Sequence, residues 1–205
     1  TYQREHILQR NTVVTTSMSN SGLAHYLRKF RIATRVVPNG DKFITRTLME
    51  ENLTLGGEEI GHIIAHTDHS HVTGDGLRTA LLVLNALALT REKTLQDLAP
   101  GMHKWPQIKA SVWIGRGIQM PRAEEIPGLP SLLHQTEKAI PDLVDLECRP
   151  ASTEPVYRIM LEAMSTETAK LAEHTKKIAE HIQTYLSRVG SPVLILDCTV
   201  GGCIK

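Results

Sequence analysis

The sequence predicts a mixed-sheet α/β domain followed by a smaller α+β domain. Strand-like and helix-like segments alternate through the first half of the 205 residues, which is typical of a parallel or mixed sheet. The second half shows the order strand, helix, two strands, helix, which is typical of an α+β layer. Because Gly101 to Pro106 has the composition of a linker, we expect domains at residues 1–101 and 106–190, with 191–205 unassigned.

The elements of the first domain follow from residue type and spacing. In chain order we expect a strand at 12–17, a helix over 23–30, a strand at 32–37, a helix over 42–51, a strand at 62–66 and a helix over 77–88. The strands are predicted by β-branched and apolar runs, and the helices by apolar residues three and four positions apart. Ser19 or Asn20 can cap the first helix, and Thr73 or Asp75 can cap the third.

The elements of the second domain are predicted in the same way. In chain order we expect a strand at 107–114, a helix over 132–140, strands at 143–148 and 156–163, and a long helix. Thr166 can cap the long helix. The apolar side chains that this helix turns inward are Leu171, Ile178, Ile182 and Tyr185. Within the unassigned tail, 193–196 is strand-like.

Composition excludes several classes of protein. A formal net charge of +1 offers no sustained field for nucleic acid or an acidic membrane. No apolar run is long enough to span a bilayer, and no signal peptide opens the chain, so we expect a cytoplasmic protein. Cys148, Cys198 and Cys203 are too few for a disulfide scaffold or a paired zinc site. Because the chain opens on Thr1 without a methionine, we expect a piece of something longer.

The stretch from Leu55 to Ile64 is the first candidate for a binding site. Its glycines can take positive φ or approach a ligand closely, and Glu58 and His62 flank that opening. The start of the helix capped by Thr73 or Asp75 should lie nearby, where free N–H groups attract substrate oxygens or stabilise Asp75. The alternative is a glycine-rich hairpin whose glutamate is salt-bridged.

Three segments carry a resemblance to one family. Residues 57–62, Gly-Glu-Glu-Ile-Gly-His, resemble the sugar-binding loop G-E-x-S-G-H of the α-D-phosphohexomutases. Residues 73–77 resemble the T-G-D-G-L of the phosphoglucosamine mutase branch. Residues 149–155, Arg-Pro-Ala-Ser-Thr-Glu-Pro, resemble the phosphate-binding loop R-P-S-G-T-E-P. The resemblance implies that this chain corresponds to the third and fourth domains of such an enzyme, an isomerase that moves a phosphate within a hexose phosphate.

The resemblance also implies two sets of site residues. The sugar-binding residues would be Gly57, Glu58, Ile60 and His62. The phosphate-binding residues would be Arg149, Ala151, Ser152 and Thr153. A carboxylate can accept from two hydroxyls, a guanidinium suits phosphate oxygens, and an imidazole can move a proton near neutral pH. The alternatives are a core histidine at 62, and an Arg149 that pairs with Glu154 or Glu147 on the surface.

Two positions depart from the family pattern. Ile60 stands where the sugar loop has serine, and Ala151 stands where the phosphate loop has serine, with Ser152 in place of the glycine. Losing a hydroxyl that bonds the substrate can alter substrate choice. These changes put glucosamine phosphate in doubt against glucose or mannose phosphate, while the T-G-D-G-L segment and the R-P-x-x-T-E-P form still favour the glucosamine branch.

Other signatures of the family do not occur in the sequence. There is no T-A-S-H-N-like segment for the phosphoserine and no D-G-D triplet for magnesium. We therefore expect no catalytic residue here beyond a proton-transfer role for His62, no metal bound by this chain, and no phosphotransfer by it alone. The missing N-terminal domains would supply the phosphoserine and the magnesium, and the ligand would be a phosphorylated hexose or hexosamine.

Three hypotheses of function remain open at this point. The first is the substrate-binding half of a phosphoglucosamine mutase serving cell-wall amino-sugar synthesis, which interconverts glucosamine 6-phosphate and glucosamine 1-phosphate. The second is a phosphomannomutase or phosphoglucomutase relative, and the third is a non-catalytic sugar-phosphate-binding or interaction module.

A metal cluster is a rival explanation for the histidine-rich segment. Its members would be His62, His66, Asp68, His69, His71 and Asp75. Because His62 and His66 lie four apart on a predicted strand, they would be about 13 Å apart, and the spacing matches no closed zinc pattern. We expect a surface loop instead.

Overall fold

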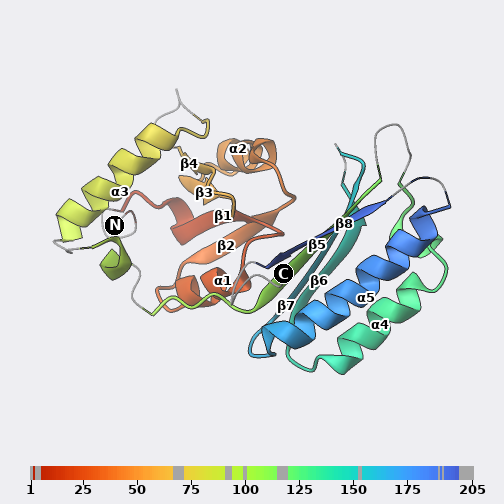
Figure 1. Ribbon diagram of the computed structural model, residues 1–205. Helices are drawn as coiled ribbons and strands as arrows, with labels where there is room; N and C mark the ends of the chain where they lie inside the picture. Colours follow the sequence, from red (N-terminus) through yellow and green to blue (C-terminus); the bar gives the residue numbers. More distant parts are fainter. Residues whose placement is uncertain are drawn as a thin grey trace. The chain divides into compact units, whose positions relative to one another are not determined.

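The computed structural model describes residues 2, 6–66, 72–90, 94–98, 101–114, 120–151, 154–188, 190 and 192–198. The chain divides into two compact units, Thr1–His103 and Lys104–Lys205. Each unit has its own four-stranded sheet, and Figure 1 shows the helices that accompany each. None of the described helices is long and apolar enough to cross a membrane.

The first unit is built on a mixed sheet, as predicted. Its strands are β1 (Thr12–Thr16), β2 (Ala33–Val37), β3 (Leu55–Gly57) and β4 (Ile63–Ala65), in the spatial order β2-β1-β3-β4. Strand β1 pairs in parallel with both β2 and β3, and β4 pairs antiparallel with β3. A parallel pair needs a crossover, and helices supply these connections.

Among its described residues this unit has three α-helices, α1 (Ser21–Arg28), α2 (Asp41–Glu50) and α3 (Gly76–Thr90). Asn20 caps α1, since its Oδ1 accepts the Gly22 N–H at 3.1 Å, which confirms one of the two predicted caps. Two short 3₁₀ segments, η1 (Gln9–Asn11) and η2 (Leu95–Leu98), complete the described elements.

The core of the first unit lies between α2 and the sheet. Its buried apolar side chains are Val14, Val37, Ile44, Leu48, Leu53 and Ile64. A Cβ at Gly56 would lie 2.5 Å from Ile44 Cγ2, so glycine lets α2 rest directly on β3. Gly56 and Gly57 lie in strand β3, so Gly57, the first residue of the predicted sugar-binding loop, belongs to a strand.

The second unit is an antiparallel sheet covered by helices. Its strands are β5 (Gln107–Trp113), β6 (Leu143–Pro150), β7 (Val156–Ala163) and β8 (Val193–Cys198), in the order β6-β7-β5-β8. Helix α5 (Thr168–Leu186) packs on β5 and β7, and α4 (Leu129–Ala139) packs on α5 and on η3 (Ala123–Glu125), as Figure 1 shows. Because β8 pairs with β5, part of the unassigned tail completes this sheet.

Two local predictions in the second unit are wrong. Thr166 does not cap α5, whose N-cap is Glu167 without a side-chain bond. The Thr166 hydroxyl instead donates to the carboxylate of Asp142, as do Ser165 Oγ and both backbone N–H groups of these residues. Strand β6 also runs through Arg149 and Pro150, so the predicted loop is shorter at its start.

Candidate functional site

The β3–β4 connection is a tight hairpin loop over residues 58–62. The Glu58 N–H donates to His62 O at 2.9 Å, and the Gly61 N–H donates to Glu58 O at 3.1 Å. Gly61 has φ +94°, in the left-handed region that favours glycine. Backbone bonds therefore fix the positions from which the side chains of Glu58, Ile60 and His62 project.

The side chains of this loop are open to solvent to different extents. Glu58 is half-buried, and in the part of the chain that the structure describes its carboxylate has no hydrogen bond or ion pair. Ile60 is 68% exposed, and His62 is also exposed. The loop thus presents an acceptor and an imidazole to solvent, and His62 does not lie in the core.

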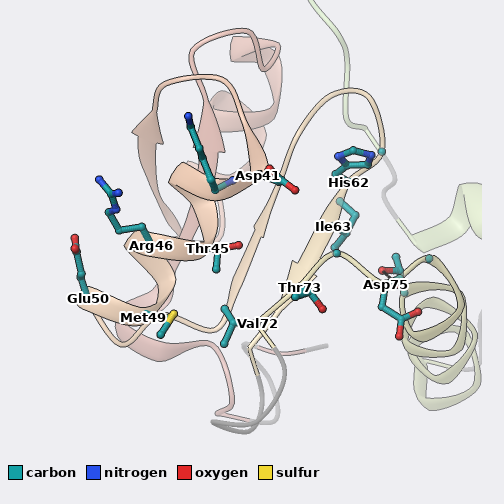
Figure 2. Close-up of a pocket in the computed structure, with 15 residues that line it drawn as sticks. Asp41, Thr45, Arg46, Met49, Glu50, His62, Ile63, Val72, Thr73 and Asp75 are labelled. Atoms are coloured by element: carbon teal, nitrogen blue, oxygen red, sulfur yellow. Dashed lines mark hydrogen bonds between the residues drawn. The ribbon is translucent and has the colours of Figure 1, made fainter. Parts of the chain in front are cut away.

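A cavity of about 800 Å³ lies beside this loop, entirely within the first unit. Its walls come from α2, the end of the hairpin loop and the start of α3 (Figure 2). The lining residues are Asp41, Lys42, Thr45, Arg46, Met49, Glu50, Gly61, His62, Ile63, Val72, Thr73, Gly74, Asp75, Gly76 and Thr79. Two segments singled out in the sequence, 57–62 and 73–77, therefore contribute to one cavity.

Only one of the four predicted sugar-binding residues lines this cavity. His62 lines it, whereas Gly57, Glu58 and Ile60 are not among its lining residues. Figure 2 shows His62 and Asp75 on one side and Thr45 of α2 on the other. The hairpin loop thus meets the cavity at its His62 end.

Sequence reasoning missed the wall formed by α2. Asp41, Lys42, Thr45 and Arg46 all line the cavity from this helix. One pattern in the sequence could have identified this wall. Positions 41, 45 and 46 are polar, whereas Ile44 between them is buried, so these three residues face away from the core side of the helix. An ammonium and a guanidinium suit anionic oxygens, and the hydroxyl and carboxylates suit the hydroxyls of a polar ligand.

At the start of α3 one backbone N–H group is engaged by a side chain of the protein itself. Asp75 Oδ1 accepts the Arg78 N–H at 2.9 Å, and Thr79 Oγ1 donates to Asp75 O at 2.7 Å. Asp75 therefore acts as the cap, which confirms one of the two predicted candidates. The bond to Arg78 satisfies one donor that a ligand could otherwise have used.

The second predicted site lies at the β6–β7 turn of the second unit. Arg149 Nε donates to Glu147 Oε1, one of the two partners considered from the sequence, although the pair is partly buried and not on the open surface. Glu154 pairs instead with Arg158, whose Nη2 lies 2.9 Å from Glu154 Oε2. The Ala151 N–H donates to Val156 O at 2.8 Å and closes the turn. Ser152 and Thr153 lie outside the described residues.

Arg158 is a second basic residue that sequence reasoning missed. It lies directly opposite Arg149 in the register of β6 and β7. Side chains of opposed residues project from the same face of a sheet, so both arginine side chains leave the same face next to this turn. Each is balanced by one carboxylate, from Glu147 and Glu154.

Three of the six residues of the rival metal cluster are among the described residues. His62, His66 and Asp75 are described, whereas Asp68, His69 and His71 lie outside the described residues. His66 Nδ1 is 3.1 Å from Leu53 O. Across the described ranges, no three side chains of the metal-binding types gather to hold an ion.

Comparison with known proteins identifies relatives of this chain. Residues 1–105 match the family described as phosphoglucomutase/phosphomannomutase, alpha/beta/alpha domain III. A phosphoglucosamine mutase from Koribacter versatilis is 36% identical over 176 residues, which is 86% of this chain and 36% of that protein. One from Parafrankia is 36% identical over 80% of this chain and 34% of its own length. The chain thus spans about a third of these relatives.

Solved structures share the fold. The N-acetylphosphoglucosamine mutase of Aspergillus fumigatus, in complex with GlcNAc-6P and magnesium, matches with a TM-score of 0.66 at 18% identity, over 90% of this chain and 41% of that one. A second crystal structure of this enzyme, in complex with glucose 1,6-bisphosphate, gives a TM-score of 0.65 at 18% identity, over 84% and 38%.

Proposed function

The chain belongs to the phosphoglucomutase/phosphomannomutase family, and from that premise we propose that it is the substrate-binding part of a phosphoglucosamine mutase-like enzyme. Such a cytoplasmic isomerase would interconvert glucosamine 6-phosphate and glucosamine 1-phosphate. One observation carries the proposal: the segments 57–62 and 73–77, which match the sugar loop and the glucosamine-branch pattern, both contribute to one cavity of about 800 Å³. A volume of this order suits a small ligand.

In the first unit the hairpin loop would bind the sugar. Glu58 would accept hydrogen bonds from two neighbouring hydroxyls, because both of its carboxylate oxygens are acceptors and no described side chain competes for them. His62, exposed at the edge of the cavity, would bond the sugar or move a proton near neutral pH. The Gly57 backbone and the Ile60 side chain would complete the contact.

In the second unit the β6–β7 turn would bind the phosphate. Glu147 engages Arg149 through Nε, and a phosphate would accept from the Nη groups. The backbone of Ala151 and the hydroxyls of Ser152 and Thr153 would add donors. Arg158, opposite Arg149, donates to Glu154 through Nη2, and its other N–H groups would be further donors for the phosphate.

The phosphoserine and the metal would come from other domains. Magnesium prefers carboxylate and carbonyl oxygens, and no three side chains of the metal-binding types gather among the described residues, so no step is assigned to a metal held by this chain. The curated relatives are more than twice as long as this chain. We propose that N-terminal domains like theirs complete the enzyme, and that this chain alone binds substrate without transferring phosphate.

A specific observation favours a second candidate, a mutase of glucose or mannose phosphate. Ile60 replaces the serine of the sugar loop, and its side chain is 68% exposed at the tip of the hairpin. An exposed apolar group there cannot bond an amine on the sugar. Comparing the heats of binding of glucosamine 6-phosphate, glucose 6-phosphate and mannose 6-phosphate would rank the two candidates.

Isothermal titration with glucosamine 6-phosphate tests the proposal. Replacing Arg149 by alanine should weaken binding by roughly 10-fold or more, since a charge-assisted hydrogen bond contributes about 1.5–3 kcal/mol. Arg35→Ala is the matched control, because Arg35 is also an ion-paired arginine and belongs to neither loop. Equal affinities for the wild type and Arg149→Ala would remove the phosphate-binding assignment.

A further inference from the structure

Helix α3 turns its most apolar face outward. Leu77 is 75% exposed, Leu81 is 59% exposed and Leu84 is 56% exposed. With the exposed Ala88, these residues are spaced four, three and four apart, so they form one continuous stripe along the helix. We call this stripe the leucine face.

The opposite face of the helix meets its own unit. Thr79, Leu82, Ala86 and Thr90 are half-buried there, and α3 packs against β4 and η2. Both threonine hydroxyls donate to carbonyls of the same segment, that of Thr79 to Asp75 O and that of Thr90 to Ala86 O. The inner face therefore holds one leucine, Leu82, beside two threonines and an alanine, whereas the outer face holds three leucines.

No residue of α3 is fully buried, although the helix is apolar nearly all round. Arg78 is the single charged residue in its sequence. A helix of this composition normally lies inside a protein, since a solvent-facing helix carries charged and polar residues on its outer side. The cavity does not account for the leucine face, because α3 contributes only Gly76 and Thr79 to its lining.

We propose that the leucine face docks a preceding domain of the full-length enzyme, through an apolar surface on that domain. The family match of residues 1–105 is to a domain numbered III, and the first curated relative is more than twice as long as this chain. The face carries no charge, so its partner surface is apolar. This inference rests on the proposed function insofar as it requires the N-terminal domains.

The test uses a double variant, Leu81→Glu with Leu84→Glu, in two proteins. One protein is this chain, and the other joins the N-terminal part of the Koribacter versatilis relative to this chain. In the joined protein the double variant should lower the melting temperature by roughly 5 °C or more, whereas in this chain alone the shift should stay within about 2 °C. Val36→Glu is the control, because Val36 is 54% exposed on β2 in the same unit.

Other outcomes would overturn the proposal. An equal loss in both proteins would mean that the leucines pack within their own unit. No loss in either would mean that nothing covers the face. If this chain alone sediments as a dimer that the double variant dissociates, while the joined protein is unaffected, a second copy covers it.

Two further measurements keep the result decisive. If the joined protein does not fold, the N-terminal part is produced separately, and its co-sedimentation with this chain should be lost in the double variant. Glucosamine 6-phosphate is titrated into this chain alone, where the double variant should leave the heat unchanged. Failure of that titration with the wild type would reject the proposed function and leave the docking result standing.

Discussion

At the scale of single residues, Glu58 and Glu59 offer an internal comparison. Both are loop glutamates, but only Glu58 occupies the glutamate position of the sugar-loop pattern. Glu58→Ala should weaken binding of glucosamine 6-phosphate by roughly 10-fold, because it removes a charged acceptor of two hydroxyl hydrogen bonds. Glu59→Ala should leave the affinity within about twofold. Isothermal titration measures both affinities. A larger loss of affinity in Glu59→Ala than in Glu58→Ala would mean that Glu59, and not Glu58, binds the sugar.

Cys148 should be chemically inert in the folded protein. It lies in β6, where burial raises the pKa of its thiol to about 12. The thiolate is the reactive form, so alkylation at pH 8 should be slow in the native chain and fast after unfolding. Mass spectrometry of the Cys148 peptide after timed treatment with iodoacetamide measures this rate. Equal rates before and after unfolding would contradict the burial.

At the scale of elements, the contact between α2 and β3 depends on Gly56. An added Cβ would lie 2.5 Å from Ile44 Cγ2 and 3.0 Å from Val14 Cβ, both in the core. Gly56→Ala should therefore lower the free energy of unfolding of the first unit by about 1–3 kcal/mol. Gly76→Ala is the control for stability, because nothing lies within 4 Å of its added Cβ. Urea titration followed by circular dichroism compares them.

Asp142 ties the start of β6 to the start of α5. Hydrogen bonds from the hydroxyls and backbone N–H groups of Thr166 and Ser165 hold the pKa of its carboxyl well below the usual range. Asp142→Asn should lower the free energy of unfolding of the second unit by about 1–2 kcal/mol at pH 7. Because folding lowers this pKa, the stabilisation is full above about pH 4 and is lost as the pH falls below it.

The pKa of Asp145 is shifted in the opposite direction to that of Asp142, so Asp145 serves as its control. Burial, followed by the charge of Glu147, raises the pKa of the Asp145 carboxyl. The ionised form is therefore disfavoured by folding, and Asp145→Asn should not lower stability at pH 7. Urea titrations of both variants at pH 7 and pH 3 would show the difference between wild type and Asp142→Asn shrinking at the lower pH. If the stability difference between wild type and Asp142→Asn did not change with pH, the stabilisation would not come from the ionised Asp142 carboxylate.

Most elements could be predicted from local pattern, and the departures have nonlocal causes. The periods of apolar residues located α2, β5 and β7 within a residue or two. Thr166 looked like a cap by sequence, but Asp142, 24 residues earlier, takes its hydroxyl. The wall that α2 forms in the cavity was missed for a nonlocal reason. The pairing of β3 with β4 brings His62 next to α2, and local sequence patterns do not show this pairing.

At the scale of the whole molecule, each unit carries its own core. Among the described residues, the buried apolar cluster of the second unit is clearly larger than that of the first. Buried apolar area is the main source of folding stability, so the first unit should be the less stable of the two.

Calorimetry of the whole chain should accordingly show two unfolding transitions, with the first unit melting at the lower temperature. Gly56→Ala should shift the lower transition alone, and Asp142→Asn the upper one alone, because each contact lies within one unit. If glucosamine 6-phosphate is then added, it should raise the transition of any unit that binds it, by mass action. A single transition shifted equally by both variants would show instead that the two cores unfold together.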